Sequence, residues 1–202
     1  MSTVETQVFI NCPFDDEYRP LFHATVFSVV LCGYTPRCAL EAQDSGEVRL
    51  NKIIRLIRTC RYGIHDISRT ELDQVNSLPR FNMPFELGLF LGAAGFGDAK
   101  QKRKVTLIFD SKRYRYQKFI SDIAGQDIKD HDCNPHHVIK KIRDWLSSSQ
   151  PNIALPGGRK LIERYENFHS TLPAMLSSLE LDEGEISFVD FCRLIQAWLV
   201  AE

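Results

Sequence analysis

The apolar positions of this chain follow two alternating patterns. Short runs rich in β-branched and aromatic residues are typical of buried strands. They occupy residues 7–12, 34–40, 62–67 and 104–109, and a brief edge strand is expected near Ile128. Between these runs, apolar residues recur with the spacing of a helix. The expected helices cover about residues 18–32, 49–58, 82–94, 116–123 and 135–146. The chain therefore alternates strand and helix.

This alternation favours a parallel sheet, because each connection must cross the sheet and is long enough to hold a helix. We expect an α/β fold with a doubly wound, flavodoxin-like parallel sheet of about five strands and helices on both faces. Residues 147–158 are rich in Ser, Pro and Gly, which predicts a linker. The expected organisation is a domain at residues 1–150 followed by a helical extension at residues 151–202.

The helical extension ends in an apolar stripe that is too large to be left in water. Its members recur at helical spacing and are Phe188, Phe191, Leu194, Ile195, Trp198 and Leu199. The sequence leaves three partners open for this stripe: the main domain, the neighbouring helix of the extension, and another subunit.

Composition and charge mainly exclude classes of function. The 202 residues are 44% hydrophobic with a formal net charge of −1, so no overall charge attracts the chain to nucleic acid or to an anionic membrane. No apolar run is long enough to span a bilayer, and residues 1–7 lack the features of a signal peptide. The six cysteines form no CxxC pair, which is typical of reduced thiols in a cytoplasmic protein.

Three polar segments have simple explanations. Residues 100–104 and 112–116 carry clustered Lys and Arg, but the balanced charge of the chain favours solvated loops over a nucleic-acid surface. Residues 130–137 contain Asp, His and Cys at a spacing that matches no zinc site. Asn134 in that segment is well placed to cap a helix. We expect neither a nucleic-acid partner nor a metal.

Glu86 is the strongest candidate for chemistry. It is the one ionisable side chain of residues 83–94, a helix expected to have Asn82 as N-cap and Pro84 in its first turn. A carboxylate among apolar residues is costly to bury, so it is expected to face a cavity or a partner. This helix follows the strand at residues 62–67, at the end where open α/β sheets bind ligands. The alternative is that Glu86 only stabilises the positive end of its own helix.

Three short segments carry a resemblance. They are VFINCPF at residues 8–14, DIS at residues 66–68 and FELG at residues 85–88. Together they resemble the TIR-like and nucleoside 2-deoxyribosyltransferase-like group, in which a flavodoxin-like sheet carries a glutamate near the start of the helix after the third strand. The resemblance covers about residues 5–147. The chain departs from the common TIR pattern before Glu86, where it has Met-Pro-Phe in place of the usual Trp-Cys pair.

The resemblance implies cleavage of an N-glycosidic bond, of NAD⁺ in the TIR enzymes and of a nucleoside in the transferases. Glu86 would stabilise or capture the oxocarbenium-like sugar. The nicotinamide of NAD⁺ is already cationic and needs no acid to leave, whereas a neutral nucleoside needs a second acid, for which Asp66 is the candidate. NAD⁺ is a substrate in this interpretation, and no cofactor is expected.

Other polar and aromatic residues near the strand ends are candidate contacts to the substrate. They are Asn11, Phe14, Asp15, Ser68, Arg69 and Asn82. Phe14 is suited to stack on a base and Arg69 to hold a diphosphate. The alternatives are structural: Asn11 ties a turn, and Asp15 caps the helix that follows it.

The family context implies a hydrolase of bacterial antiphage defence that releases ADP-ribose or a cyclic form of it. It also implies a homo-oligomer, with a partner defence protein as a further expectation. Two other functions stay open. One is a nucleoside deoxyribosyltransferase or N-glycosidase that needs Asp66 as well as Glu86. The other is a non-catalytic module that senses a nucleotide or binds a partner through the C-terminal apolar stripe.

Overall fold

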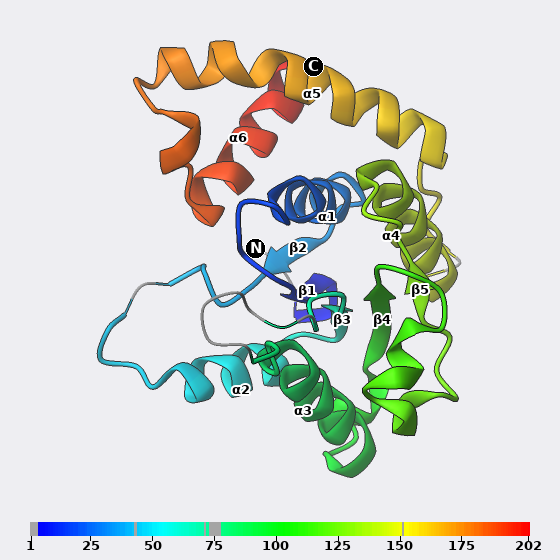
Figure 1. Cartoon of the computed structure of the whole chain (residues 1–202). Helices are drawn as coiled ribbons and strands as arrows, with labels where there is room; N and C mark the ends of the chain where they lie inside the picture. Colours follow the sequence, from blue (N-terminus) through cyan, green and yellow to red (C-terminus); the bar gives the residue numbers. More distant parts are fainter. Residues whose placement is uncertain (1–3, 43, 71, 73–77, 151) are drawn as a thin grey trace.

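The computed structural model describes residues 4–42, 44–70, 72, 78–150 and 152–202 (Figure 1). Its centre is one parallel sheet with the strand order β2-β1-β3-β4-β5. The strands are β1 (Gln7–Asn11), β2 (Thr35–Arg37), β3 (Tyr62–Asp66), β4 (Val105–Asp110) and β5 (Lys129–Asp130). This order is that of the flavodoxin-like folds and confirms the expected α/β class.

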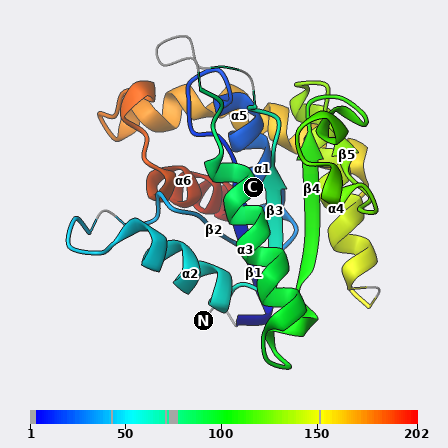
Figure 2. The ribbon, with the colours of Figure 1, turned by 60° about the horizontal axis from the view of Figure 1, so that its bottom comes forward.

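Helices cover both faces of the sheet. One face carries α1 (Arg19–Leu31) and α4 (Pro135–Ser149), and the other carries α2 (Arg49–Thr59) and α3 (Asn82–Phe96) (Figure 1). Figure 2 shows α2 and α3 side by side in front of the strands. The core is correspondingly divided, since Phe27 packs with the α1 and α4 side and Phe90 with the α2 and α3 side.

The C-terminal extension consists of α5 (Gly158–Ser178) and α6 (Phe188–Ala201), which lie over α1 (Figure 1). Phe27 of α1 lies 6.0 Å from Trp198 and 5.4 Å from Phe168, measured between ring centroids. Phe191 and Ile195 are almost fully buried in the same cluster. The apolar stripe therefore packs within the chain, against both the main domain and its neighbouring helix.

Several expected boundaries are corrected. Residues 116–123 form two short 3₁₀ turns, Arg115–Lys118 and Ser121–Ile123, because the backbone leaves the helical region at Phe119 and Ile120 between them. The linker is shorter than expected, since α4 continues to Ser149 and α5 begins at Gly158. None of the helices formed by the described residues is long and apolar enough to cross a membrane.

The expected caps are confirmed at one helix and wrong at another. Asn134 caps α4 as expected, and its Oδ1 accepts a 2.8 Å hydrogen bond from the backbone N–H of His136. Asn82 was expected to cap α3, but it is the first helical residue, and Phe81 takes the N-cap position without a side-chain hydrogen bond. Pro84 does lie in the first turn, where its missing N–H costs nothing.

Candidate functional site

Polar side chains gather where the parallel strands end. Asn11, Asp66 and Asp110 are the last residues of β1, β3 and β4, and His131 directly follows β5. The carboxyl ends of parallel strands lie at one edge of the sheet, where ligands of open α/β folds bind. All four side chains are buried. Their placement makes the carboxyl edge of the sheet the candidate site.

Asp66 is the centre of a buried polar network. Its Oδ2 accepts a 2.6 Å hydrogen bond from the Tyr18 hydroxyl, and its Oδ1 accepts a 2.8 Å hydrogen bond from the backbone N–H of Ser68. His131 Nε2 lies 3.0 Å from Asp66 Oδ2. Burial by itself would raise the pKa of Asp66, but His131, Ser68 and Tyr18 hold this pKa below its usual value. Asp66 is therefore ionised at neutral pH.

The tautomer of His131 follows from its contacts. Its Nδ1 accepts a 2.9 Å hydrogen bond from the backbone N–H of Cys133, so that nitrogen carries no proton. The ring proton is consequently on Nε2, which lies beside Asp66, although the N–H is not well aligned on the oxygen. The turn that brings this contact about has Asp132 and Cys133 at φ of 49° and 52°, in the left-handed region.

Arg115 connects the ends of β3 and β4. Its Nε donates a 2.8 Å hydrogen bond to Asp110 Oδ1, and its Nη2 donates a 2.6 Å hydrogen bond to the backbone carbonyl of Ser68. Nη1 donates a further 2.8 Å hydrogen bond to the Thr70 hydroxyl. Burial raises the pKa of Asp110, and Arg115 opposes that shift. One guanidinium thus fixes the backbone that leaves β3.

Glu86 is the fifth residue of α3 and is only 8% exposed. Among the described residues, no hydrogen bond or ion pair to its carboxylate is formed. Burial raises its pKa to about 7, and the positive charge of Arg49 opposes the shift. The interaction with a helix dipole fades beyond the first turn, so the position of Glu86 gives little support to a purely dipole-stabilising role.

The Cys12 thiol lies within electrostatic reach of three carboxylates. Burial raises the pKa of this thiol, and the negative charges of Asp66, Glu86 and Asp15 raise it further. These three acids come from the end of β3, from α3 and from the segment after β1. Glu86 and Asp66 therefore act on the same region of the carboxyl edge.

Asn11 connects β1 to the helix that carries Glu86. Its Nδ2 donates a 2.9 Å hydrogen bond to the backbone carbonyl of Met83, in the first turn of α3. The same nitrogen lies 3.0 Å from His65 Nδ1 in β3. Asn11 is 3% exposed. Its observed contacts position α3 at the junction of β1 and β3.

Asp15 and Arg69 are brought together. Arg69 Nη2 lies 3.1 Å from Asp15 Oδ1 and 2.7 Å from Glu17 Oε2. Asp15 also accepts hydrogen bonds from Arg80 Nη1 and from the backbone N–H of Tyr18, at 3.1 and 3.0 Å. The Arg69 guanidinium thus shares its charge with two carboxylates, and Asp15 does hold the turn that leads into α1.

The remaining predicted residues lie in different surroundings. Phe14 packs edge-to-face on Phe22 at 5.3 Å and, with Asp15 and Phe188 of α6, lines a cavity of about 150 Å³. Ser68 is buried and contributes its backbone to the Asp66 and Arg115 contacts. Asn82 is exposed at the start of α3. The structure places Phe14 near the C-terminal extension and Asn82 at the surface.

Sequence reasoning missed four members of the network: Tyr18, Asp110, Arg115 and His131. Asp110 could have been found, since it directly follows an apolar strand in the same way as Asp66. His131 lies in the segment rich in metal-type ligands, but a two-residue strand gives too little periodicity to place it at the sheet edge. Among the described residues, no group of three or more His, Cys, Asp or Glu is arranged to hold a metal ion.

Comparison with models of known protein families found no match to this chain, and a search of curated proteins likewise found no significant match. The chemistry of the carboxyl edge therefore rests on its geometry. The described residues offer one nearly buried carboxylate whose pKa burial raises to about 7, Glu86, and one carboxylate that is held ionised, Asp66.

Proposed function

We propose that this protein cleaves the N-glycosidic bond of NAD⁺ or a related nucleotide, with Glu86 as the catalytic carboxylate. The observation that carries the proposal is the state of Glu86: it is nearly buried at the ligand-binding edge of the sheet and forms no ion pair with any described residue. A carboxylate kept in such surroundings without a partner costs stability, and functional sites are where such costs are usual.

The chemistry requires one anion. As the bond between ribose and nicotinamide breaks, the electron pair leaves with the neutral nicotinamide and positive charge develops on the sugar. The ionised Glu86 stabilises or captures that cation, and water then adds to give ADP-ribose and a proton. An internal nucleophile of the substrate would instead give a cyclic ADP-ribose. Bound NAD⁺ would itself favour the ionised form of Glu86, since its nicotinamide is cationic.

Asp66 has a structural role in this proposal. Asp66 is ionised and surrounded by donors, which suits it to hold the ends of β3 and β5 together rather than to deliver a proton. This state favours NAD⁺ over a neutral nucleoside, whose base needs an acid in order to leave. The wider setting, a homo-oligomer in bacterial antiphage defence with a partner protein, rests on the TIR-like resemblance, and the cytoplasmic location rests on the cysteine pattern.

Nicotinamide release tests the proposal. Purified protein at high concentration is incubated with NAD⁺, and nicotinamide, ADP-ribose and cyclic ADP-ribose are separated and quantified. Glu86→Gln should reduce release by about 10²- to 10³-fold, the usual cost of removing one group that stabilises transition-state charge. Asp122→Asn, at an exposed residue of a 3₁₀ turn, is the matched control and should keep the native rate. Equal release by native protein and Glu86→Gln would overturn the assignment.

A further inference from the structure

The outer edge of β4 is only partly covered by its neighbouring strand. β4 runs from Val105 to Asp110, whereas β5 has only two residues and pairs with Phe109 and Asp110. On the opposite side, β3 pairs with β4 from Val105 to Phe109. The first part of β4 therefore has a partner strand on one side only.

The hydrogen bonds show which residues face the uncovered side. Val105 donates its N–H to the carbonyl of Arg61, and Phe109 accepts from the N–H of Ile67, so these two residues face β3. Asp110 accepts a 3.1 Å hydrogen bond from the N–H of His131 and faces β5. Backbone groups alternate sides along a parallel strand. Thr106 therefore presents its N–H and C=O to the uncovered side.

The chain that precedes β5 turns away instead of covering Thr106. The N–H of Ile128 donates a 3.0 Å hydrogen bond to the carbonyl of Gln126, and the N–H of Gln126 donates one of 2.9 Å to the carbonyl of Ile123. These local hydrogen bonds hold residues 126–128 in a turn, so the segment does not run alongside Thr106 as an extended strand. The backbone of Thr106 forms no hydrogen bond with the turn at Gln126–Ile128.

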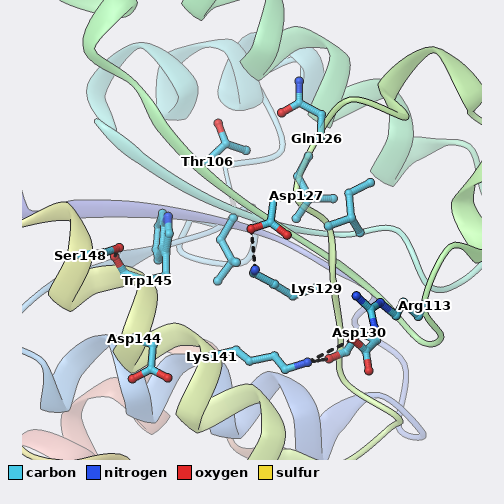
Figure 3. A pocket seen from close by; sticks show the side chains of 13 residues that line it. Thr106, Arg113, Gln126, Asp127, Lys129, Asp130, Lys141, Asp144, Trp145 and Ser148 are labelled. Carbon is cyan, nitrogen blue, oxygen red and sulfur yellow. Dashed lines mark hydrogen bonds and ion pairs between the residues drawn. The ribbon is translucent and has the colours of Figure 1, made fainter.

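The uncovered edge lies at the bottom of a groove of about 670 Å³ (Figure 3). Its floor is residues 106–108 of β4. One wall is α4, with Lys141, Asp144, Trp145 and Ser148, and the other is the segment of residues 126–130. The groove is separate from the carboxyl edge, since neither Glu86 nor Asp66 lines it.

The charges of the groove balance one another. Its lining contains three basic side chains and three acidic ones, namely Arg113, Lys129, Lys141, Asp127, Asp130 and Asp144. Lys129 lies 2.6 Å from Asp127, and Lys141 lies 3.3 Å from Asp130. A lining of zero formal charge with internal ion pairs is complementary to an uncharged ligand, and it disfavours a phosphate or a nucleic acid.

We propose that this groove binds an extended, uncharged peptide segment of a partner protein, which pairs with Thr106 as an added strand. Strand addition to an exposed sheet edge draws its affinity from main-chain hydrogen bonds, which an uncharged segment supplies. A second copy of this chain is a poor occupant, because its own β4 edge lies in the same concave groove. A single extended segment is narrow enough to enter between α4 and residues 126–130.

A phage-displayed random peptide library, selected against the full-length protein, supplies the probe. The selected peptide is synthesised with neutral side chains and measured by calorimetry against three proteins: native, Thr106→Pro and Thr106→Val. Proline removes the outward N–H of Thr106 without affecting the ladder to β3, and valine keeps that N–H. We expect Thr106→Pro to weaken binding by about tenfold or more and Thr106→Val to bind as native does.

N-methylation of the peptide provides a test that needs no change in the protein. Methyl groups on alternate amides, placed in either of the two registers, should abolish binding in one register and spare it in the other, because a strand pairs through every second residue. The proposal is overturned if no selected peptide discriminates native protein from folded Thr106→Pro, or if both methylated registers bind equally. It is also overturned if Thr106→Pro dissociates a native dimer, which would make a second copy the occupant.

Discussion

The Tyr18 hydroxyl donates a 2.6 Å hydrogen bond to Asp66 Oδ2, with both side chains buried. Tyr18 immediately precedes α1, and Asp66 is the last residue of β3. The contact therefore joins two segments that are separated by 48 residues in the sequence. Because Asp66 is ionised and inside the protein, each of its donors offsets part of the cost of burying the charge.

Replacing Tyr18 with Phe should lower the free energy of unfolding by about 1.5–3 kcal/mol, the usual value of a hydrogen bond to a charged group. The ring is retained, so packing changes little and the effect reports the lost hydroxyl. Urea denaturation at pH 7 measures it. Tyr114→Phe is the control, since Tyr114 is exposed. An effect of Tyr18→Phe no larger than that of the control would show that the hydrogen bond contributes nothing.

Glu86→Gln should stabilise the protein above pH 7. Burial raises the folded-state pKa of Glu86 to about 7 from an ordinary value of 4.5. Between these values the folded protein holds a proton that the unfolded chain releases, so the free energy of unfolding falls as pH rises. Glutamine has no proton to lose, and the gain should reach about 2–3 kcal/mol at pH 8. Thermal denaturation at pH 5 and pH 8 measures it.

A loss of stability in Glu86→Gln would contradict the proposed role of Glu86. If Glu86→Gln lowers the melting temperature at pH 8, the carboxylate stabilises the folded chain and is not held at a cost for catalysis. A variant that is both more stable and inactive is the expected signature of a functional residue.

The proposed NAD⁺ cleavage should increase with pH through about 7. The reaction needs the ionised carboxylate, and burial raises the pKa of Glu86 to about 7 in the free protein. The quantity that reports this pKa is kcat/KM, measured from pH 5 to pH 9 at constant ionic strength. At saturating NAD⁺, the midpoint for kcat should lie lower, because the cationic nicotinamide favours the ionised carboxylate. A flat profile of kcat/KM would exclude Glu86 as the group whose ionisation limits the reaction.

Asn11→Asp should impair the proposed reaction because it displaces the helix that carries Glu86. A carboxylate cannot donate a hydrogen bond, so its oxygen would face the Met83 carbonyl in place of the present 2.9 Å contact from Nδ2. We expect a loss of stability of about 1–3 kcal/mol and a fall in kcat that exceeds the change in KM, because the first turn of α3 shifts relative to β1. Asp122→Asn, at an exposed residue of a 3₁₀ turn, should leave both nearly unchanged.

Mild acid should weaken the attachment of the C-terminal helix through His23. This ring stacks on Phe191 of α6 at 3.9 Å, and burial lowers its pKa to about 4 from 6.5, with His169 and Arg19 adding to the shift. Below pH 6.5 the unfolded chain binds a proton that the folded protein excludes, so stability falls as pH decreases toward 4.

The expected loss through His23 is about 1–3 kcal/mol between pH 7 and pH 4.5, reduced because the ring is partly exposed. His23→Phe should remove this part of the pH dependence, since phenylalanine stacks on Phe191 without titrating. His137→Phe, at a half-buried ring of α4 that contacts neither His23 nor Phe191 in the described structure, is the control. Melting temperatures across this range decide the matter, and an identical slope for native protein and His23→Phe would contradict the prediction.

Much of the fold could be predicted from local patterns. The runs around β1, β3 and β4 are apolar and β-branched, and the structure has each strand within a residue of the expected end. Asn134 was expected to cap α4 for a local reason, because its side chain reaches a backbone N–H two residues later. The pattern failed at residues 116–123, where the apolar spacing is helical but the backbone leaves the helical region at Phe119 and Ile120.

That Glu86 is a lone acid on an apolar helix after a strand can be read from the amino-acid order, because both facts are local in the chain. The surroundings of the carboxyl edge depend on the folded chain, since Tyr18, His131 and Arg115 reach the ends of β3 and β4 from distant segments. The same holds for the uncovered edge at Thr106, which exists because β5 pairs with only the end of β4. Local patterns follow from backbone and side-chain preferences, whereas these contacts arise only when the strands align in one sheet.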